Sequence, residues 1–475
     1  MLPPSTGPRW QRTYLDLALL LVTVALYWRV ASTGYQIVLA PEGVAATSVD
    51  YTAFLAPLGL WIGGGLLLMR IARLGLDTQR AALAAALKPM AARLSDPIAA
   101  SISRQSRRIA GGIALAALAF AFATSTAVFD ATYNAQALVD AQLTNGADVT
   151  VTGTRANPAG EQLHPIRRQP GVAAAEPMQH RYAYVGNDLQ DLYGIDPATI
   201  GRATTVAGAY FAGRGARGTL GRLTKTPDGV LASQETVNDF QLALGDLINL
   251  RLQTGADRQY RTVPFHLVGV VTEFPTAPHD SFLAANAAYV AAQTGDPHAE
   301  LVFVRANGDV GTLAGTIRTA LGPASPLKVT SLSDADRTIG SSLVAVDLSA
   351  LSRIELAFAV RLAVGSTGLV LWLGLDERQR SAAILAALGA SPAEIGMFVR
   401  AEAALILVGG AVCGLFIGEI VAGMLVKILN GVFDPPPHAL QQPWGYLLLV
   451  LAMASAALWI ATRQRRPDAV QAGIS

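Results

Sequence analysis

Residues 376–426 read DERQRSAAILAALGASPAEIGMFVRAEAALILVGGAVCGLFIGEIVAGMLV, and this stretch decides the fold. Its second part, residues 403–426, is apolar over a length sufficient for a helix to cross about 30 Å of hydrocarbon. Its first part, residues 376–400, mixes charged and apolar positions around a glycine and a proline. The stretch therefore predicts a membrane span preceded by an ordered segment at the membrane surface.

Five further apolar runs of similar length flank it, at residues 14–31, 54–71, 109–128, 356–375 and 444–461. Over its 475 residues the chain is 52% hydrophobic and 15% charged, whereas about 25% of residues are charged in soluble domains. A soluble protein with buried core helices is the alternative, and the number of runs disfavours it. We expect a polytopic α-helical membrane protein with about six transmembrane helices.

The distribution of basic residues predicts the orientation. Residues 70–108 are rich in arginine and lysine, whereas residues 32–52 and 430–443 contain neither. Short cytoplasmic loops are enriched in both residues, so both termini are expected to be cytoplasmic and residues 129–355 to lie outside the cell membrane. That interval contains 17 basic and 22 acidic residues. Nothing in this pattern indicates a nucleic-acid partner.

The interval 129–355 has the pattern of a large extracytoplasmic mixed α+β domain, because period-two and helical apolar patterns alternate along it. Strands are expected at residues 147–154, 172–185, 230–232, 247–253, 259–272, 282–284, 301–305 and 327–330. Helices are expected at residues 163–169, 234–244, 286–293 and 310–321. The Gly- and Arg-rich residues 202–223 are expected to form a loop. Residues 130–143 and 333–354 are expected to extend the adjacent spans as helical stalks.

Several kinds of site are missing from the sequence. No lysine follows a glycine, which excludes a P-loop. No two histidines have the i, i+4 spacing of a helical metal site, and the single Cys413 excludes a disulfide scaffold or a Cys-rich zinc site. No G-x-S-x-G motif is present. We therefore predict no catalytic residue, metal or cofactor in this chain.

The segment before residue 403 has a helix, a stop and a restart. Residues 377–388 have helical spacing with a narrow apolar face, and Gly389 ends the helix. Ser391, Pro392 and Glu394 then supply a hydroxyl N-cap, a proline at the first helical position and the glutamate of a capping box. The result is an elbow that either works as a lever for a cytoplasmic partner or is an ordinary connection between helices.

The sequence ERQRSAAILAALGASPAEIGMFVRAEA, residues 377–403, resembles the signature of the FtsX/MacB-type ABC transporter permease family. The outer interval resembles the periplasmic core of that family in LTNGADVTVTG, PGVAAAEP, LYGIDPATI, GVLASQETVNDFQLALGDLINL and FHLVGVVTEFP. The match runs from about residue 109 to 465. The stretch Gln379, Arg380 and Ser381 departs from it, since the family usually has an acidic residue there.

The resemblance implies a coupling helix that docks on a separate ABC ATPase subunit, where ATP and Mg bind. Its implied residues are Glu377, Arg378, Arg380, Ile384, Leu388, Gly389, Ser391 and Glu394. The resemblance also implies a second permease copy or permease half as a partner. The two N-terminal spans resemble the middle hairpin of longer, duplicated members, so the chain looks like the C-terminal half of such a permease, complete or cut from a longer one.

The predicted domains follow from these patterns. They are an N-terminal transmembrane hairpin with a basic cytoplasmic segment (1–108), a transmembrane helix (109–128), the MacB-like core domain with its stalks (129–355), an FtsX-like three-helix membrane unit with the coupling helix (356–465) and a cytoplasmic tail (466–475).

Two further groups lie within predicted spans. Gly410, Gly414 and Gly418 recur every four residues and predict close helix packing, either at a dimer seam or within the chain. Arg361 and Glu419 lie at similar predicted depths, and isolated charge in a membrane is costly, so we predict an ion pair between them. The alternative is that each side chain extends to the outer interface.

The resulting prediction is a permease subunit that couples ATP hydrolysis by its partner to movements of the outer domain, and that exports or relocates a lipid, lipoprotein or amphipathic compound. One alternative is a mechanotransmitting subunit that activates a cell-wall hydrolase or another envelope protein. A second is a membrane-anchored enzyme or sensor without an ATPase. A large apolar groove on the outer domain would favour transport, and a flat polar docking face would favour mechanotransmission. The sequence specifies neither the cargo nor the direction of movement.

Overall fold

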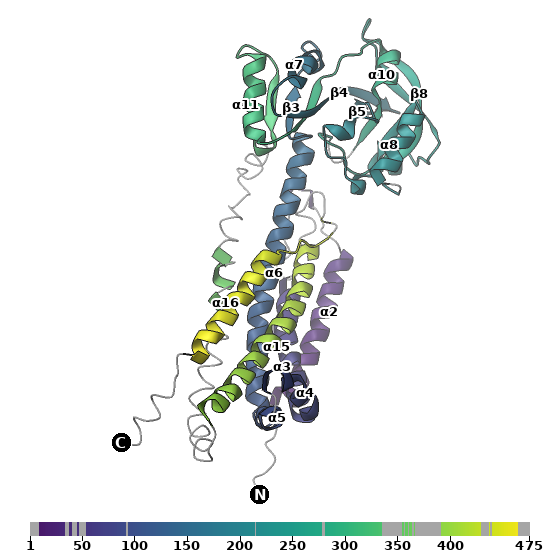
Figure 1. Ribbon diagram of the computed structural model, residues 1–475. Helices are drawn as coiled ribbons and strands as arrows, with labels where there is room; N and C mark the ends of the chain where they lie inside the picture. The colour runs from purple at the N-terminus through teal and green to yellow at the C-terminus, as the bar shows by residue number, and fades with distance from the viewer. Residues whose placement is uncertain are drawn as a thin grey trace. The chain divides into compact units, whose positions relative to one another are not determined.

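The computed structural model describes residues 9–33, 38–39, 45–46, 54–91, 94–213, 215–277, 281–334, 391–428, 437 and 439–463, and a few positions between 354 and 365 (Figure 1). Its contacts divide the chain into two compact units. Unit 1 comprises Met1–Gln136 and Asp347–Ser475, and unit 2 comprises Ala137–Val346.

The described part of unit 1 is helical apart from the short antiparallel pair β1 (Val38–Leu39) and β2 (Ala45–Ala46). Its helices are α1 (Arg9–Arg12), α2 (Leu15–Thr33), α3 (Leu55–Thr78), α4 (Arg80–Ala91), α5 (Ser95–Arg104), α6 (Ser106–Asn145), α15 (Pro392–Ile428) and α16 (Trp444–Arg463). The last residues of α6 belong to unit 2.

Within the described ranges, three helices are long and apolar enough to cross a membrane: Leu55–Thr78, Ser106–Asn145 and Glu394–Ile428. They contain the expected spans at residues 54–71, 109–128 and 403–426 almost completely. Trp444–Ile460 is a shorter apolar helix. The expected span at residues 14–31 lies in α2, which is not among these three candidates, and the expected span at residues 356–375 lies mostly outside the described residues, so the count of about six stays a prediction.

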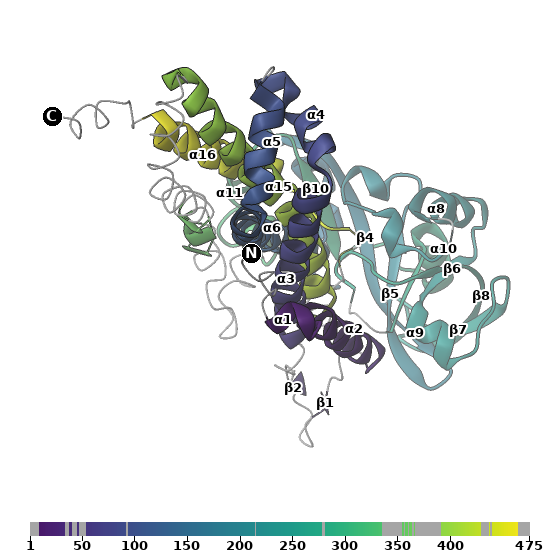
Figure 2. The same ribbon diagram turned by 90° about the horizontal axis from the view of Figure 1, so that it is seen from below.

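Helices α3, α6 and α15 lie side by side in unit 1 (Figures 1 and 2). Small side chains allow the close approach: a Cβ placed on Gly65 of α3 would lie 2.8 Å from Leu118 of α6. Trp61 of α3 also donates a hydrogen bond of 3.0 Å to the backbone oxygen of Leu118. The three helices thus form a packed bundle rather than separate spans.

Unit 2 is built on one sheet. Among the described residues, nine strands pair in the order β11-β3-β10-β4-β5-β9-β6-β8-β7, with β4 also pairing with β7. The strands are β3 (Val149–Thr152), β4 (Val172–Val185), β5 (Asp188–Ile195), β6 (Gly229–Ser233), β7 (Leu247–Gln253), β8 (Tyr260–Val271), β9 (Phe282–Asn286), β10 (Leu301–Ala306) and β11 (Lys328–Ser331). The extra pairing closes β4, β5, β9, β6, β8 and β7 into a ring.

Strand β4 joins the two parts of this sheet. Its first half pairs with β10, and its last three residues pair with β7. One apolar core, which includes Phe265 and Leu250, lies among the strands of the ring. Another, which includes Val151 and Ile317, lies between the β11-β3-β10-β4 part and its helices α7 (Leu163–Arg167) and α11 (Val310–Leu321).

Most expected elements of unit 2 are confirmed. The bounds of β4, β7 and α11 agree with the expectation, and helices α9 (Gln234–Asp239) and α10 (Ala287–Thr294) lie at their expected places. The expected loop at residues 202–223 is wrong, because α8 (Gly215–Lys225) forms there around buried Leu223. Strand β5 is an addition to the expected strands. Three 3-10 turns complete the described part of the unit, at Ala159–Gln162, Ile200–Arg202 and Gly208–Tyr210.

The stalk expected at residues 130–143 is confirmed, since α6 runs without interruption to Asn145. Leu143 near its end packs into a core of unit 2 that includes Phe303 and Tyr193. The second expected stalk, residues 333–354, lies almost entirely outside the described residues.

Candidate functional site

The predicted elbow contains a formed capping box at the start of α15. The backbone N–H of Ser391 donates to Oε2 of Glu394 at 2.8 Å, and the Ser391 hydroxyl donates to the same oxygen at 2.9 Å. The backbone N–H of Glu394 donates back to the Ser391 hydroxyl at 3.4 Å. This reciprocal arrangement fixes where α15 begins. The other predicted coupling residues, Glu377, Arg378, Arg380, Ile384, Leu388 and Gly389, lie outside the described residues.

The first turns of α15 pack against residues of four other helices, α3, α4, α5 and α6. Met397 and Phe398 pack in an apolar cluster with Leu87 of α4, Ile102 of α5 and Ile109 of α6. Helices α4 and α5 are the basic segment that follows α3, and each buries one apolar face in this cluster. A displacement of the elbow would therefore act on the whole cluster rather than on α15 alone.

An ion pair ties α15 to α6 near the same end. Arg108 Nη2 lies 2.8 Å from Oε1 of Glu402, and only 6% of the Glu402 side chain is exposed. Buried carboxylates need such a partner, because an unpaired charge in a low-dielectric interior is costly. No local sequence pattern identifies this pair, since the two residues are 294 positions apart.

The glycine face of α15 packs within the chain. A Cβ atom added to Gly410, Gly414 or Gly418 would lie 2.5, 2.5 or 2.6 Å, respectively, from a side chain of α6. The contacted α6 side chains are those of Ala116, Phe120 and Thr124. Of the two interpretations that the sequence left open, the structure supports intrachain packing of this face.

The predicted ion pair between Arg361 and Glu419 is not formed. Glu419 instead accepts a hydrogen bond from the side-chain amide of Gln442, and Arg361 is exposed. Counting residues along each helix gives the depth of Arg361 and of Glu419 in the membrane. It does not give the direction in which either side chain points. Here the two side chains have similar predicted depths and different surroundings.

A second buried ion pair went unpredicted. Arg70 of α3 binds Asp16 of α2 through both oxygens, at 2.6 and 2.7 Å, and Asp16 is fully buried. Two parallel N–H bonds to one carboxylate give a geometrically specific contact. The signal was available in the sequence, because both residues lie at the ends of their predicted spans that are expected to face the cytoplasm.

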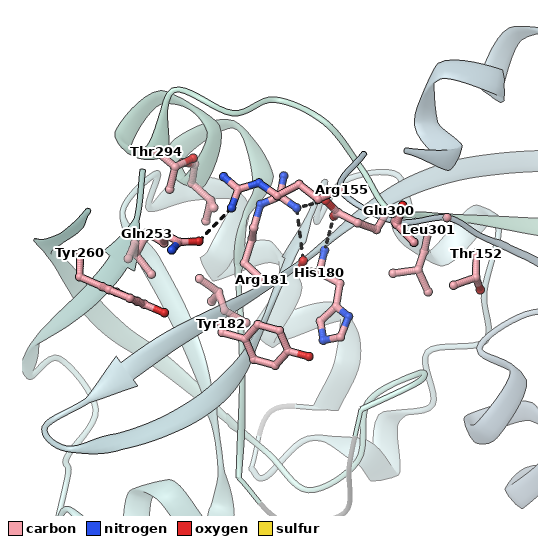
Figure 3. A pocket seen from close by; sticks show the side chains of 15 residues that line it. Thr152, Arg155, His180, Arg181, Tyr182, Gln253, Tyr260, Thr294, Glu300 and Leu301 are labelled. Atoms are coloured by element: carbon pink, nitrogen blue, oxygen red, sulfur yellow. Dashed lines mark hydrogen bonds and ion pairs between the residues drawn. The ribbon is translucent and has the colours of Figure 1, made fainter. Parts of the chain in front are cut away.

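Unit 2 contains a pocket of about 410 Å³ beside β4 (Figure 3). Its polar walls come from the segment after β3 (Thr154, Arg155), from β4 (His180, Arg181) and from the start of β10 (Glu300). Leu192, Leu252, Val290 and Leu301 supply its apolar walls. The lining residues are far apart in sequence, so the sequence analysis did not identify this pocket.

A charge network forms one wall of this pocket. Arg181 pairs closely with Glu300, and its Nη2 lies 3.4 Å from Oδ2 of Asp296. Arg155 lies 3.0 Å from the same Asp296 oxygen. Burial alone would raise the pKa of Asp296, but hydrogen bonds from His298 and the charges of Arg181 and Arg155 outweigh it and lower that pKa. The lowered pKa keeps Asp296 ionised near neutral pH, beside Arg181 and Arg155.

Two family models match the chain. The MacB-like periplasmic core domain matches residues 112–319, and the FtsX-like permease C-terminal domain matches residues 353–466. A search of curated proteins finds no match.

Among solved structures, the extracellular domain of the noncanonic ABC-type transporter YknZ from Gram-positive bacteria is similar to this chain. The similarity covers 39% of this chain and 98% of that domain, with 12% identity and a TM-score of 0.26. The two family matches, which follow one another along the chain, identify it as a member of the FtsX/MacB-type ABC transporter permease family.

Proposed function

We propose that this chain is the permease subunit of an ABC transporter in which a separate cytoplasmic ATPase moves the extracytoplasmic unit 2. Permeases of this family work with an ABC ATPase. The observation that carries the proposal is the double attachment of α15 to α6, through the glycine face and through the pair Arg108–Glu402.

The proposed transmission has three steps. The ATPase displaces the segment around residues 377–388, whose docking role rests on the family resemblance. The capping box at Ser391 and Glu394 passes this displacement to α15, because it fixes the start of that helix. Helix α15 then carries α6 with it, and α6 reaches unit 2 as one uninterrupted helix, Ser106–Asn145.

The same proposal assigns the chain to the plasma membrane as a multi-pass protein with about six spans, both termini in the cytoplasm and unit 2 outside. A second permease copy or half would complete the transporter. Intrachain packing occupies the glycine face of α15, so the partner subunit would bind another surface. The exposed side of the same helix, which includes Val408, Val412 and Phe416, offers apolar area for lipid or for that partner.

Export or relocation of a lipid, lipoprotein or amphipathic compound is the output that we propose first. The second candidate is mechanotransmission to a cell-wall hydrolase or another envelope protein. The polar and charged lining of the unit 2 pocket favours this second candidate over a lipid chain held in that pocket.

The test begins with isolation of the tagged full-length chain from membranes together with the ATP-hydrolysing subunit that it binds. Leu388→Glu and Ile384→Glu should remove that subunit or lower its permease-stimulated ATP hydrolysis at least 10-fold. Ala386→Glu is the matched control, because helical periodicity puts it on the opposite face of the expected helix. If all three variants still bind and stimulate an ATPase equally, the coupling proposal is wrong. If no ATPase is recovered with the unmodified chain, the enzyme or sensor alternative gains support.

A further inference from the structure

The pocket in unit 2 combines an internally neutral wall with two exposed aromatic rings. Figure 3 shows Arg181 bound to Glu300 and Arg155 bound to Gln253, with the rings of Tyr182 and Tyr260 lower in the view. The volume of about 410 Å³ is in the range of small-molecule sites, which lies at roughly 300–1,000 Å³. A ligand in this pocket would contact both the polar wall and the rings.

Each charge of the wall already has an opposite charge beside it. The two oxygens of Glu300 accept from the Arg181 side chain and from the backbone N–H of His180. Arg155 divides its donors between Asp296 and Gln253, at 3.0 Å each. An ionised ligand that displaced Asp296 or Glu300 from Arg181 would leave that carboxylate, of which 8% is exposed, without its charge complement, which is unfavourable. The Arg181 part of the wall therefore favours a ligand without net charge.

Hydrogen-bonding capacity nevertheless remains at the pocket. The Nε of Arg181 is buried and has no hydrogen-bond partner among the described residues, although only 8% of the Arg181 side chain is exposed. Hydroxyl groups of Thr152, Thr154 and Thr294 also line the pocket. A ligand rich in hydroxyl groups can accept from the Arg181 Nε–H, and it can both donate to and accept from threonine hydroxyls.

The aromatic rings supply an apolar surface of defined orientation. Tyr182 is 53% exposed and Tyr260 is 43% exposed, although both lie on strands of the closed ring. Tyr260 is held by an edge contact with Tyr184 at 5.1 Å between ring centroids, and Tyr182 lies 5.3 Å from the ring of His180. Rings held in this way present flat faces at a low cost in conformational entropy.

We propose that this pocket binds an uncharged carbohydrate, with sugar C–H groups against Tyr182 and Tyr260 and sugar hydroxyls at the arginine and threonine wall. A neutral sugar combines an apolar ring face with a hydroxyl rim, which matches the two sides of the pocket. The ligand is either a free glycan of the envelope or the headgroup of a neutral glycolipid. Binding needs no ATPase, so the proposal is independent of the coupling described above.

The test uses the full-length chain in nanodiscs without nucleotide. Chitotetraose and cellotetraose are titrated as neutral probes, tetragalacturonate as a charged probe of similar size, and a neutral tetra-alanine amide as a peptide probe. A second arm uses nanodiscs that contain monoglucosyl diacylglycerol. Saturable binding of a neutral oligosaccharide identifies a free glycan as the source, and binding confined to the second arm identifies a glycolipid headgroup.

Tyr182→Ala and Tyr260→Ala should each weaken that binding about 3- to 10-fold, with a larger loss in the double variant. Phe240→Ala is the matched control, because Phe240 is a partly exposed aromatic residue of unit 2 that does not line the pocket. The thermal melting curve of each variant, which should match that of the unmodified chain, separates lost binding from lost folding.

Three results would overturn the proposal. They are the absence of saturable binding in both arms, binding of tetragalacturonate or the peptide at least as tight as that of the neutral sugars, and equal binding by the double tyrosine variant. Each can be observed while ATPase recovery with the chain is intact, so this failure is distinguishable from failure of the coupling proposal.

Discussion

The α6–α15 seam of unit 1 and the charge network of unit 2 reach a defined geometry by different means. At the seam, Gly410, Gly414 and Gly418 bring two backbones together by removing side chains. In the network, long charged side chains are buried and specify one another by pairing, with 8% of Arg181 and of Glu300 exposed. Shape determines the first contact and charge the second.

The difference follows from the two solvents. In a membrane, lipid is as apolar as the helices, so association depends on close packing and on a few polar contacts. A domain in water gains from burying apolar area and tolerates a buried ion pair where further hydrogen bonds satisfy it. Under the proposed function, helices in contact over small residues transmit displacement, whereas the paired network of unit 2 holds the pocket in one arrangement.

The strongest test of the comparison is Arg181→Met. It removes the charge between Glu300 and Asp296, and breaking a buried pair costs about 3–5 kcal/mol. Hydrogen exchange followed by mass spectrometry should show lost protection in β4 and β10. Arg261→Met is the control, because 67% of the Arg261 side chain is exposed in its pair with Asp257, and it should change protection little. Equal effects of the two substitutions would refute the role given to burial.

Gly414→Ala tests the seam. A Cβ there would lie 2.5 Å from Cβ of Phe120 and 2.6 Å from the backbone oxygen of Ala117, so the helices must separate. Overpacking of this kind costs about 1–3 kcal/mol. Gly423→Ala is the matched control on the same helix, since its Cβ would meet only Leu440 at 3.8 Å. Thermal unfolding in detergent should show a lower midpoint for Gly414→Ala alone, and a shared loss would mean that the seam is not specific.

The sequence predicted this seam only in part. The four-residue glycine period requires a helix to approach that face, because the face carries no side chain, but it does not say which helix. Likewise Ser391 and Glu394 predicted their own contact, because a capping box lies within one turn. Arg361 and Glu419 did not pair, because similar depth leaves the rotation of each helix undetermined.

The unit 2 pocket shows the same limit more strongly. Strands β4 and β7 followed from alternating apolar residues, which is a local signal. Arg155, Arg181 and Glu300 meet only because β4 is shared between two parts of the sheet and β10 pairs with it. No local pattern marks a residue for such a contact. The loop expected at residues 202–223 was wrong because glycine and arginine lowered the helical signal, although α8 buries Leu223.

A double-mutant cycle of Arg108→Gln and Glu402→Gln sharpens the comparison, because this pair is the charged contact of the seam. The expected coupling energy is about 1–2 kcal/mol, smaller than the loss at Arg181 because 28% of the Arg108 side chain is exposed. Unfolding midpoints of the four proteins give this value. Each single-substitution variant should also lower permease-stimulated ATP hydrolysis if the pair helps α15 to move α6. Additive effects on stability would mean that the two residues do not interact.

Acidification should produce the smallest effect, and it should differ between the two regions. The pKa of Asp296 is lowered because the hydrogen bonds from His298 and the charges of Arg181 and Arg155 outweigh its burial. A carboxyl group whose pKa is lower in the folded state stabilises that state above its unfolded pKa of about 3.9, and the contribution is lost as the pH falls through the folded pKa. The melting midpoint of unit 2 should therefore fall as the pH is lowered from about 5 to about 3.

Asp296→Asn should have a lower midpoint near neutral pH and a shallower decline below pH 4. Other carboxylates titrate in both proteins, so the difference between the two curves is the measurement, and parallel curves would exclude Asp296 as a source of the pH dependence. The glycine face around Gly414 has no titratable side chain, so this difference should be absent from α15.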